Sequence, residues 1–88
     1  MRSVDVIVTG RVQGVGFRAY AKKNANMLGV RGYVENLEDG SVHAVLEGDD
    51  HQVDKMIEVI RSGPMLSQVR EMKKKDLQPS GFKNFEVS

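Results

Sequence analysis

A glycine-rich segment that ends in an arginine carries the clearest chemical signal in this chain of 88 residues. It reads GRVQGVGFR and occupies residues 10–18. Closely spaced glycines allow successive backbone N–H groups to converge on one point, and a helix that starts there adds free N–H groups and a partial positive charge. The guanidinium of Arg18 can donate two parallel hydrogen bonds to a phosphate. We therefore predict a phosphate-binding loop made of Gln13, Gly14, Val15, Gly16, Phe17 and Arg18.

Two other interpretations fit this loop when it is considered by itself. One is an ordinary strand-to-helix turn followed by a solvated arginine. The other is a dinucleotide-binding fingerprint, because Gly14-x-Gly16-x-x-Ala19 has the required glycine spacing and Glu35 follows at a suitable distance. That fingerprint needs a parallel crossover strand and a second half. Here Asp39-Gly40 is expected to turn the chain back in a hairpin, which argues against it.

The hydrophobic pattern predicts the elements that would hold this loop. Apolar residues alternate with polar ones in the expected strands and recur with helical spacing in the expected helices. An aspartate before the second helix is expected to cap it. The predicted elements are a strand over 4–9, a loop over 10–16, a helix over 17–28, strands over 30–36 and 41–47, a helix from Asp49 or Asp50 to Ser62, an edge strand near 67–77, and a short closing strand in which Phe85 and Val87 face inward.

This order, β-α-β-β-α-β followed by a short strand, is that of the ferredoxin-like α+β sandwich. It predicts an antiparallel sheet with two helices on one face and a short extra C-terminal strand. The length of 88 residues fits a single domain over residues 1–88. Many unrelated functions share this fold, so the side chains of the site must decide the function.

The composition restricts the classes of protein to which the chain can belong. It contains no cysteine, which excludes disulfides, thiolate metal sites and a cysteine nucleophile. The net charge is only +1, so no overall field draws the protein to nucleic acid or to a membrane. No apolar stretch is long enough to span a membrane, and Asp5 lies where a signal peptide needs its apolar region. We therefore expect a cytoplasmic protein.

Two sequence motifs resemble the two signatures of the acylphosphatase family. The first reads GxVQGVxFR at residues 10–18, and the second reads GYVENxxxGxV at residues 32–42, with Gly48 further along the chain. The resemblance covers essentially the whole chain and implies the ferredoxin-like fold. Similar domains also occur in larger hydrogenase-maturation proteins, and we expect a stand-alone enzyme here. By the same resemblance, Arg18 binds the phosphate and Asn36 orients the attacking water.

The implied reaction is the hydrolysis of a carboxyl–phosphate anhydride to a carboxylate and inorganic phosphate. Carboxylic acids have pKa values of about 4, so the leaving group departs without a proton from the enzyme. Positioning and neutralisation of the phosphoryl oxygens then supply most of the catalysis. We expect no metal and no cofactor, a small acyl phosphate as substrate, inorganic phosphate as product and competitive inhibitor, and a monomeric enzyme.

The surroundings of Asn36 leave two points open. Without the family motif, Asn36 could equally be a turn residue before the hairpin. Glu35 stands where the family usually has a basic or long neutral residue, and it would repel the substrate if it leaned into the site. Strand alternation with Asn36 predicts instead that Glu35 points away.

Two other functions fit the fold less well. Arg31-Gly32-Tyr33 matches the opening of an RNA-recognition motif, but Glu35 occupies a position where that motif needs a stacking aromatic, so we expect no nucleic-acid binding. A phosphate-sensing module would need the loop alone, and here both catalytic positions are filled. We expect the Lys73–Lys75 run to be a solvated edge, and His43 and His51 to lie on the surface.

Overall fold

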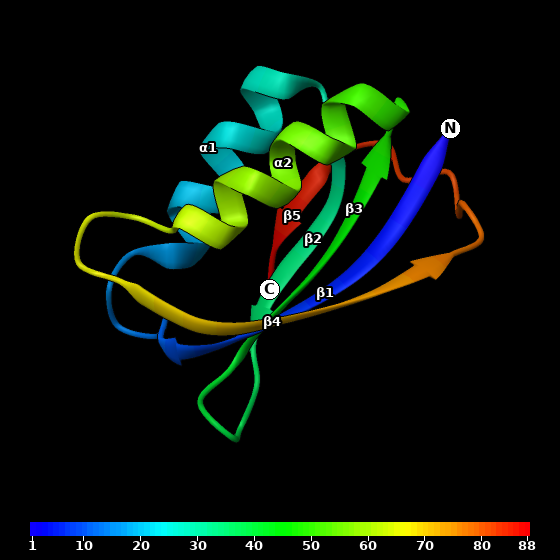
Figure 1. The fold of residues 1–88 in the computed structure, drawn as a ribbon. Coiled ribbons are helices and arrows are strands. Elements are labelled where there is room, and N and C mark those ends of the chain that lie inside the picture. The colour runs from blue at the N-terminus through cyan, green and yellow to red at the C-terminus, as the bar shows by residue number, and fades with distance from the viewer.

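Two helices cover one face of a five-stranded sheet in the computed structural model, which describes residues 1–88 (Figure 1). This arrangement confirms the predicted ferredoxin-like order with its short closing strand. The elements are β1 (Arg2–Arg11), α1 (Phe17–Leu28), β2 (Arg31–Asn36), β3 (Val42–Gly48), α2 (Asp50–Ser62), β4 (Gln68–Leu77) and β5 (Phe85–Val87).

The strands follow the order β4-β1-β3-β2-β5 across the sheet. The four long strands pair antiparallel, as predicted, and β4 is an edge strand. The short β5 pairs parallel to β2, with Val87 opposite Val34, so the complete sheet is mixed rather than antiparallel. The parallel pairing brings the C-terminal end of β5 to the same end of the sheet as Asn36, the last residue of β2.

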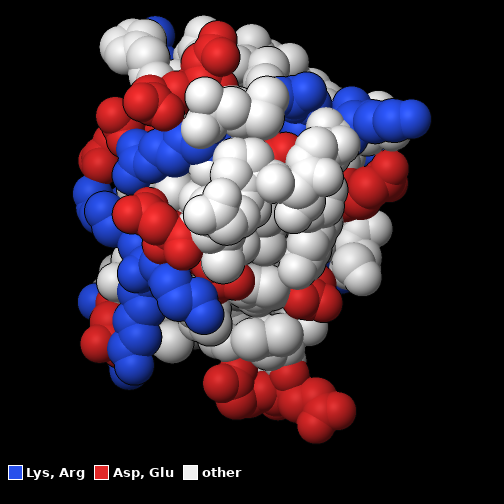
Figure 2. All heavy atoms as spheres, turned by 90° about the vertical axis from the view of Figure 1, so that its right-hand side faces the viewer, with Lys and Arg blue, Asp and Glu red and all other residues white.

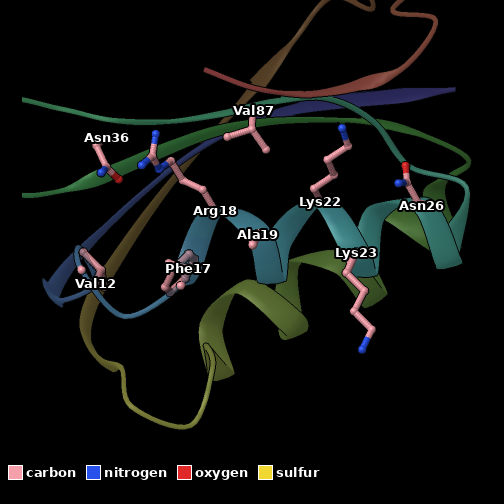
Figure 3. A pocket seen from close by; sticks show the side chains of 11 residues that line it. Val12, Phe17, Arg18, Ala19, Lys22, Lys23, Asn26, Asn36 and Val87 are labelled. Carbon is pink, nitrogen blue, oxygen red and sulfur yellow. The ribbon is translucent and has the colours of Figure 1, made fainter.

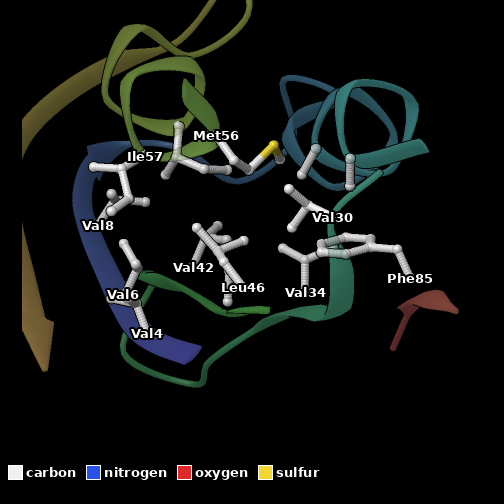
Figure 4. Close-up of a cluster of buried hydrophobic side chains, with 14 of the residues drawn as sticks. Val4, Val6, Val8, Val30, Val34, Val42, Leu46, Met56, Ile57 and Phe85 are labelled. Atoms are coloured by element: carbon white, nitrogen blue, oxygen red, sulfur yellow. The ribbon is translucent and has the colours of Figure 1, made fainter. Parts of the chain in front are cut away.

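A core of 17 buried apolar residues lies between the sheet and the helices (Figure 4). Val4, Val6 and Val8 point from β1 into this core, which confirms the predicted alternation. The first helix contributes small side chains and the second contributes larger ones, namely Ala21, Ala25, Val53, Met56, Ile57 and Ile60. Phe17, the first residue of α1, is also buried. The core therefore fixes the end of α1 that follows the predicted phosphate loop.

The loop after β1 is shorter in the structure than the sequence predicted. β1 continues to Arg11 through a register shift between Thr9 and Gly10, so the loop starts at Val12. The backbone of β4 explains the glycine, because a Cβ on Gly10 would lie 2.2 Å from the carbonyl oxygen of Gln68. Gly10 thus permits close strand pairing and does not start a turn.

The helix boundaries agree with the predictions, although the predicted cap is absent. α1 ends at Leu28 and is capped by Gly29, whose φ of 73° lies in the left-handed region that favours glycine. α2 starts after Asp49, but the Asp49 side chain makes no capping hydrogen bond, so the capping prediction is wrong. Asp50 in the first turn still places a negative charge near the positive end of the helix dipole.

A buried carboxylate ties the segment before β5 to the sheet. The Glu47 side chain on β3 is fully buried, and its oxygens accept hydrogen bonds from the backbone N–H groups of Ser80, Gly81 and Phe82 at 2.7, 2.8 and 3.0 Å. Burial by itself would raise the pKa of Glu47, but these hydrogen bonds outweigh it and lower the pKa. Glu47 therefore holds in place the connection from which β5 starts.

Replacing Glu47 with glutamine is expected to lower the free energy of unfolding by about 2 kcal/mol, because a carboxamide is uncharged and offers one oxygen to donors that now share two. Denaturant unfolding of the wild type and of Glu47→Gln measures the loss. Glu86→Gln removes an exposed carboxylate from β5 and is the matched control. Equal stability of Glu47→Gln and the wild type would contradict the anchoring role.

The same carboxylate makes the free energy of unfolding depend on pH. Because its pKa is lower in the folded than in the unfolded chain, its stabilisation is complete above the unfolded value of about 4.3. That stabilisation disappears as the pH falls through the lower folded value. We therefore expect a smaller loss of stability between neutral and acid pH in Glu47→Gln than in the wild type.

Candidate active site

The loop between β1 and α1 presents a row of unpaired backbone N–H groups. None of the N–H groups of residues 14–19 donates to a backbone carbonyl of the protein. Gly14 and Gly16 have φ angles of 73° and 77°, a left-handed conformation that residues with a side chain rarely adopt. Gly16 is also the N-cap of α1 and has no side chain to cap it. Free N–H groups at a helix N-terminus can bind an anion.

Arg18 projects from the first turn of α1 towards the end of β2 (Figure 3). Its Nη1 donates a hydrogen bond to the backbone carbonyl of Ser88 over 2.8 Å. Ser88 is itself held at the sheet, because its N–H donates to the carbonyl of Val34 over 2.9 Å. The sheet therefore fixes the position of the guanidinium, while its other N–H groups remain available to a ligand.

Asn36 lies opposite Arg18 at the end of β2. It is on the same side of the strand as the buried Val34, two residues earlier, so its side chain points to the face that α1 covers. The residue is exposed, and Figure 3 shows its carboxamide turned towards the guanidinium of Arg18. The structure thus brings together the two residues that the sequence motifs place 18 positions apart.

These groups line one cavity of about 590 Å³ (Figure 3). The cavity is larger than a phosphate group needs, so an acyl group has room beside the phosphate. Four of the six predicted loop residues line it, namely Gly14, Gly16, Phe17 and Arg18. The remaining lining residues are Val12, Ala19, Lys22, Lys23, Asn26, Asn36 and Val87.

The other two predicted loop residues, Gln13 and Val15, do not line the cavity. The Gln13 carboxamide donates hydrogen bonds to the backbone carbonyls of Leu37 and Ser41, over 2.8 and 2.9 Å. Both partners belong to the turn that follows β2, so Gln13 ties the loop to the strand that ends in Asn36. Val15 is partly buried and packs against the core.

The wall of the cavity away from the phosphate loop was not predicted. Lys22, Lys23 and Asn26 contribute to it from α1, and Val87 from β5. Lys22 and Asn26 follow Arg18 at intervals of four residues, a helical spacing from which they could have been inferred. Val87 is 42% exposed and faces this cavity instead of the core, so that prediction is wrong, whereas Phe85 is buried as predicted.

Glu35 points away from the cavity, as predicted. On the opposite face of the sheet its Oε2 lies 2.7 Å from Nδ1 of His43, and Oδ2 of Asp5 lies 2.8 Å from Nε2. His43 points outward from its buried neighbours, as predicted, but its side chain is only 14% exposed, whereas His51 is exposed as predicted. Burial by itself would lower the pKa of His43, but the two carboxylates outweigh it and raise the pKa.

Three further features bear on other kinds of partner. Lys73–Lys75 is exposed on the edge strand β4, as predicted. Figure 2 shows basic and acidic side chains intermixed along the left-hand margin of its view. The His, Asp and Glu side chains form no group of three or more that could hold a metal ion. Neither helix combines the length and the apolar character needed to cross a membrane.

The chain resembles known proteins in both sequence and structure. The model of the acylphosphatase family matches residues 4–87. An acylphosphatase from Methanocella arvoryzae is 58% identical over 87 residues, which cover 99% of each chain. Another from Bordetella parapertussis is 49% identical over 97% of this chain and 92% of the relative. The crystal structure of acylphosphatase from Bacillus subtilis superposes with a TM-score of 0.97 at 30% identity, covering 100% of this chain and 99% of the other.

Proposed function

Because this chain belongs to the acylphosphatase family, it is an enzyme that hydrolyses acyl phosphates, and we propose that Arg18 binds the phosphate while Asn36 orients the attacking water. One observation carries these roles: the guanidinium, the unpaired loop N–H groups and the carboxamide all border the same cavity. The first two supply positive charge for the phosphate. Asn36 supplies a neutral group that can hold a water beside it.

The phosphate end of the substrate sits in the loop in this proposal. Its oxygens accept hydrogen bonds from the unpaired N–H groups of those loop residues that line the cavity and from the guanidinium of Arg18. The hydrogen bond from Arg18 to Ser88 fixes the guanidinium before the substrate arrives. Donors that are already in place need no reorganisation as charge develops in the transition state, which is why such sites are effective.

The chemical step needs no proton donor on the enzyme. The oxygen of the water forms a bond to phosphorus while the bond between phosphorus and the acyl oxygen breaks. The carboxylate leaves with the electron pair, and a non-bridging phosphate oxygen takes the proton of the water. The Asn36 carboxamide accepts a hydrogen bond from this water, which fixes its direction of attack. In this scheme no metal or cofactor takes part.

The reaction class is tested by comparing benzoyl phosphate with the monoester phenyl phosphate. We expect the anhydride to be hydrolysed at least about a thousandfold faster, because benzoate leaves as a much weaker base than phenolate and no general acid is present. The activity should persist after treatment with a chelator. Similar rates for the two substrates would contradict the assignment, and a loss of activity that added metal restores would contradict the metal-free mechanism.

Three expectations about the enzyme in solution stay predictions. Inorganic phosphate should be a competitive inhibitor, because it fits the same loop as the phosphate of the substrate. The enzyme should be a monomer and should act in the cytoplasm. Product inhibition kinetics and sedimentation measurements test the first two.

A further inference from the structure

A groove with basic walls continues from the phosphate loop along α1. A second cavity of about 500 Å³ adjoins the first, and the two share Lys22 and Asn26. Together they are lined by five basic side chains but by one acidic side chain only, namely Arg18, Lys22, Lys23, Arg31, Lys83 and Glu86. The whole chain carries a net charge of only +1, so this is a marked local excess of positive charge.

None of these basic side chains forms an ion pair with an aspartate or a glutamate. The ion pairs of the protein involve Arg2, Arg61 and His43, and none includes a basic residue of the groove. Glu86 lines the second cavity but not the first. The first cavity therefore has basic residues and no acidic residue in its wall, and this charge exceeds what the phosphate needs.

Lys22 is the basic residue best placed to act with Arg18. It lies four residues further along α1, or about 6 Å along the helix axis, on the same side of the helix. Figure 3 shows Arg18 and Lys22 both pointing from α1 towards the strands, with Val87 between them, whereas Lys23 points the other way. A substrate that extends from the loop along α1 would pass Val87 and then meet the ammonium group of Lys22.

We propose that this enzyme prefers acyl phosphates whose acyl part carries a second anionic group, and that Lys22 binds that group. The inference rests on the proposed function, because the phosphate must occupy the loop for the acyl part to extend along α1. Val87 contacts the carbon skeleton, and the ammonium of Lys22 pairs with the distal carboxylate or phosphate. A neutral acyl group of the same size leaves Lys22 without a partner.

The preference is tested with 4-carboxybenzoyl phosphate and 4-carbamoylbenzoyl phosphate. The two substrates have the same shape and the same reacting group and differ in the charge at the far end. We expect kcat/KM to be about three- to tenfold higher for the carboxylate, the size of a partly solvated ion pair. The ratio should fall as salt is added. A ratio of one or less in the wild type would overturn the inference.

The role of Lys22 is tested with Lys22→Met, which keeps the length and helix propensity of the side chain but removes its charge. The ratio of the two kcat/KM values should fall to about one in this variant. Lys75→Met removes the same charge from the exposed edge strand β4 and should keep the wild-type ratio. An equal fall in both variants would show a general effect of net charge and would overturn the assignment to Lys22.

Binding measurements separate this inference from the proposed function. If the enzyme hydrolyses neither substrate, the proposed function is overturned, whatever the role of Lys22. Calorimetric dissociation constants for 4-carboxyphenylphosphonate and 4-carbamoylphenylphosphonate require no turnover. Tighter binding of the carboxylate by the wild type, but not by Lys22→Met, supports the anionic subsite. Equal binding of the two phosphonates by the wild type overturns it.

Discussion

Arg18→Ala is expected to lower kcat/KM for benzoyl phosphate by a factor of about 10³–10⁵, the range seen when an arginine that stabilises a phosphoryl transition state is removed. It should also abolish inhibition by inorganic phosphate. Both effects have one cause, because Arg18 provides the only charged side chain that Figure 3 shows beside Asn36. Steady-state kinetics with and without phosphate measure the two effects together.

Two further variants show whether the loss is specific to the guanidinium. Arg18→Lys should lower kcat/KM almost as much as Arg18→Ala does. A single ammonium cannot bond the Ser88 carbonyl and also present a planar pair of donors to phosphate. Arg70→Ala removes an exposed arginine from β4 and should keep wild-type kinetics. Undiminished phosphate inhibition in a folded Arg18→Ala protein would refute the binding role.

Local sequence patterns were enough to predict most of the fold, whereas the centre of the site also needed the resemblance to the acylphosphatase family. The alternation of Val4, Val6 and Val8 indicates that one face of the strand is buried. The spacing of apolar residues after Phe17 indicates a helix with one buried face. Both are properties of neighbouring residues, so the sequence displays them directly. The pairing of Arg18 with Asn36 was expected only from the resemblance to the acylphosphatase family. The structure explains it physically, because the βαβ unit places the helix start near the end of the second strand.

The parts that could not be predicted depend on contacts between distant segments. The parallel pairing of β5 with β2 creates the positions of Val87 and Ser88, and a strand of three residues carries too little pattern to show its partner or direction. Gln13 was placed in the site because it lies in the loop. Its role in tying that loop to the turn after β2 depends on carbonyl groups that every residue has, and these leave no trace in the sequence.

Asn36→Ala is expected to lower kcat for benzoyl phosphate by about a hundredfold or more while the inhibition constant of phosphate changes little. This separation of effects is what distinguishes Asn36 from Arg18. The phosphate keeps the guanidinium and the loop N–H groups, so binding survives, but the water loses the carboxamide that directs it to phosphorus. Because Asn36 is exposed at the end of β2, its removal opens no cavity in the core, and the fold should be retained.

A second substitution at Asn36 also tests its role in positioning the water. Asn36→Asp keeps the shape and an oxygen acceptor but places a negative charge beside the phosphate, so it should weaken phosphate binding as well as turnover. Asn24→Ala removes a carboxamide that bonds the Tyr20 carbonyl on α1, outside the cavity lining, and should preserve both constants. Near-native kcat in Asn36→Ala would mean that the water is positioned by the phosphate and the loop alone. A parallel loss of kcat and phosphate affinity in that variant would instead make Asn36 part of the phosphate-binding site, and the division of roles between loop and strand would have to be abandoned.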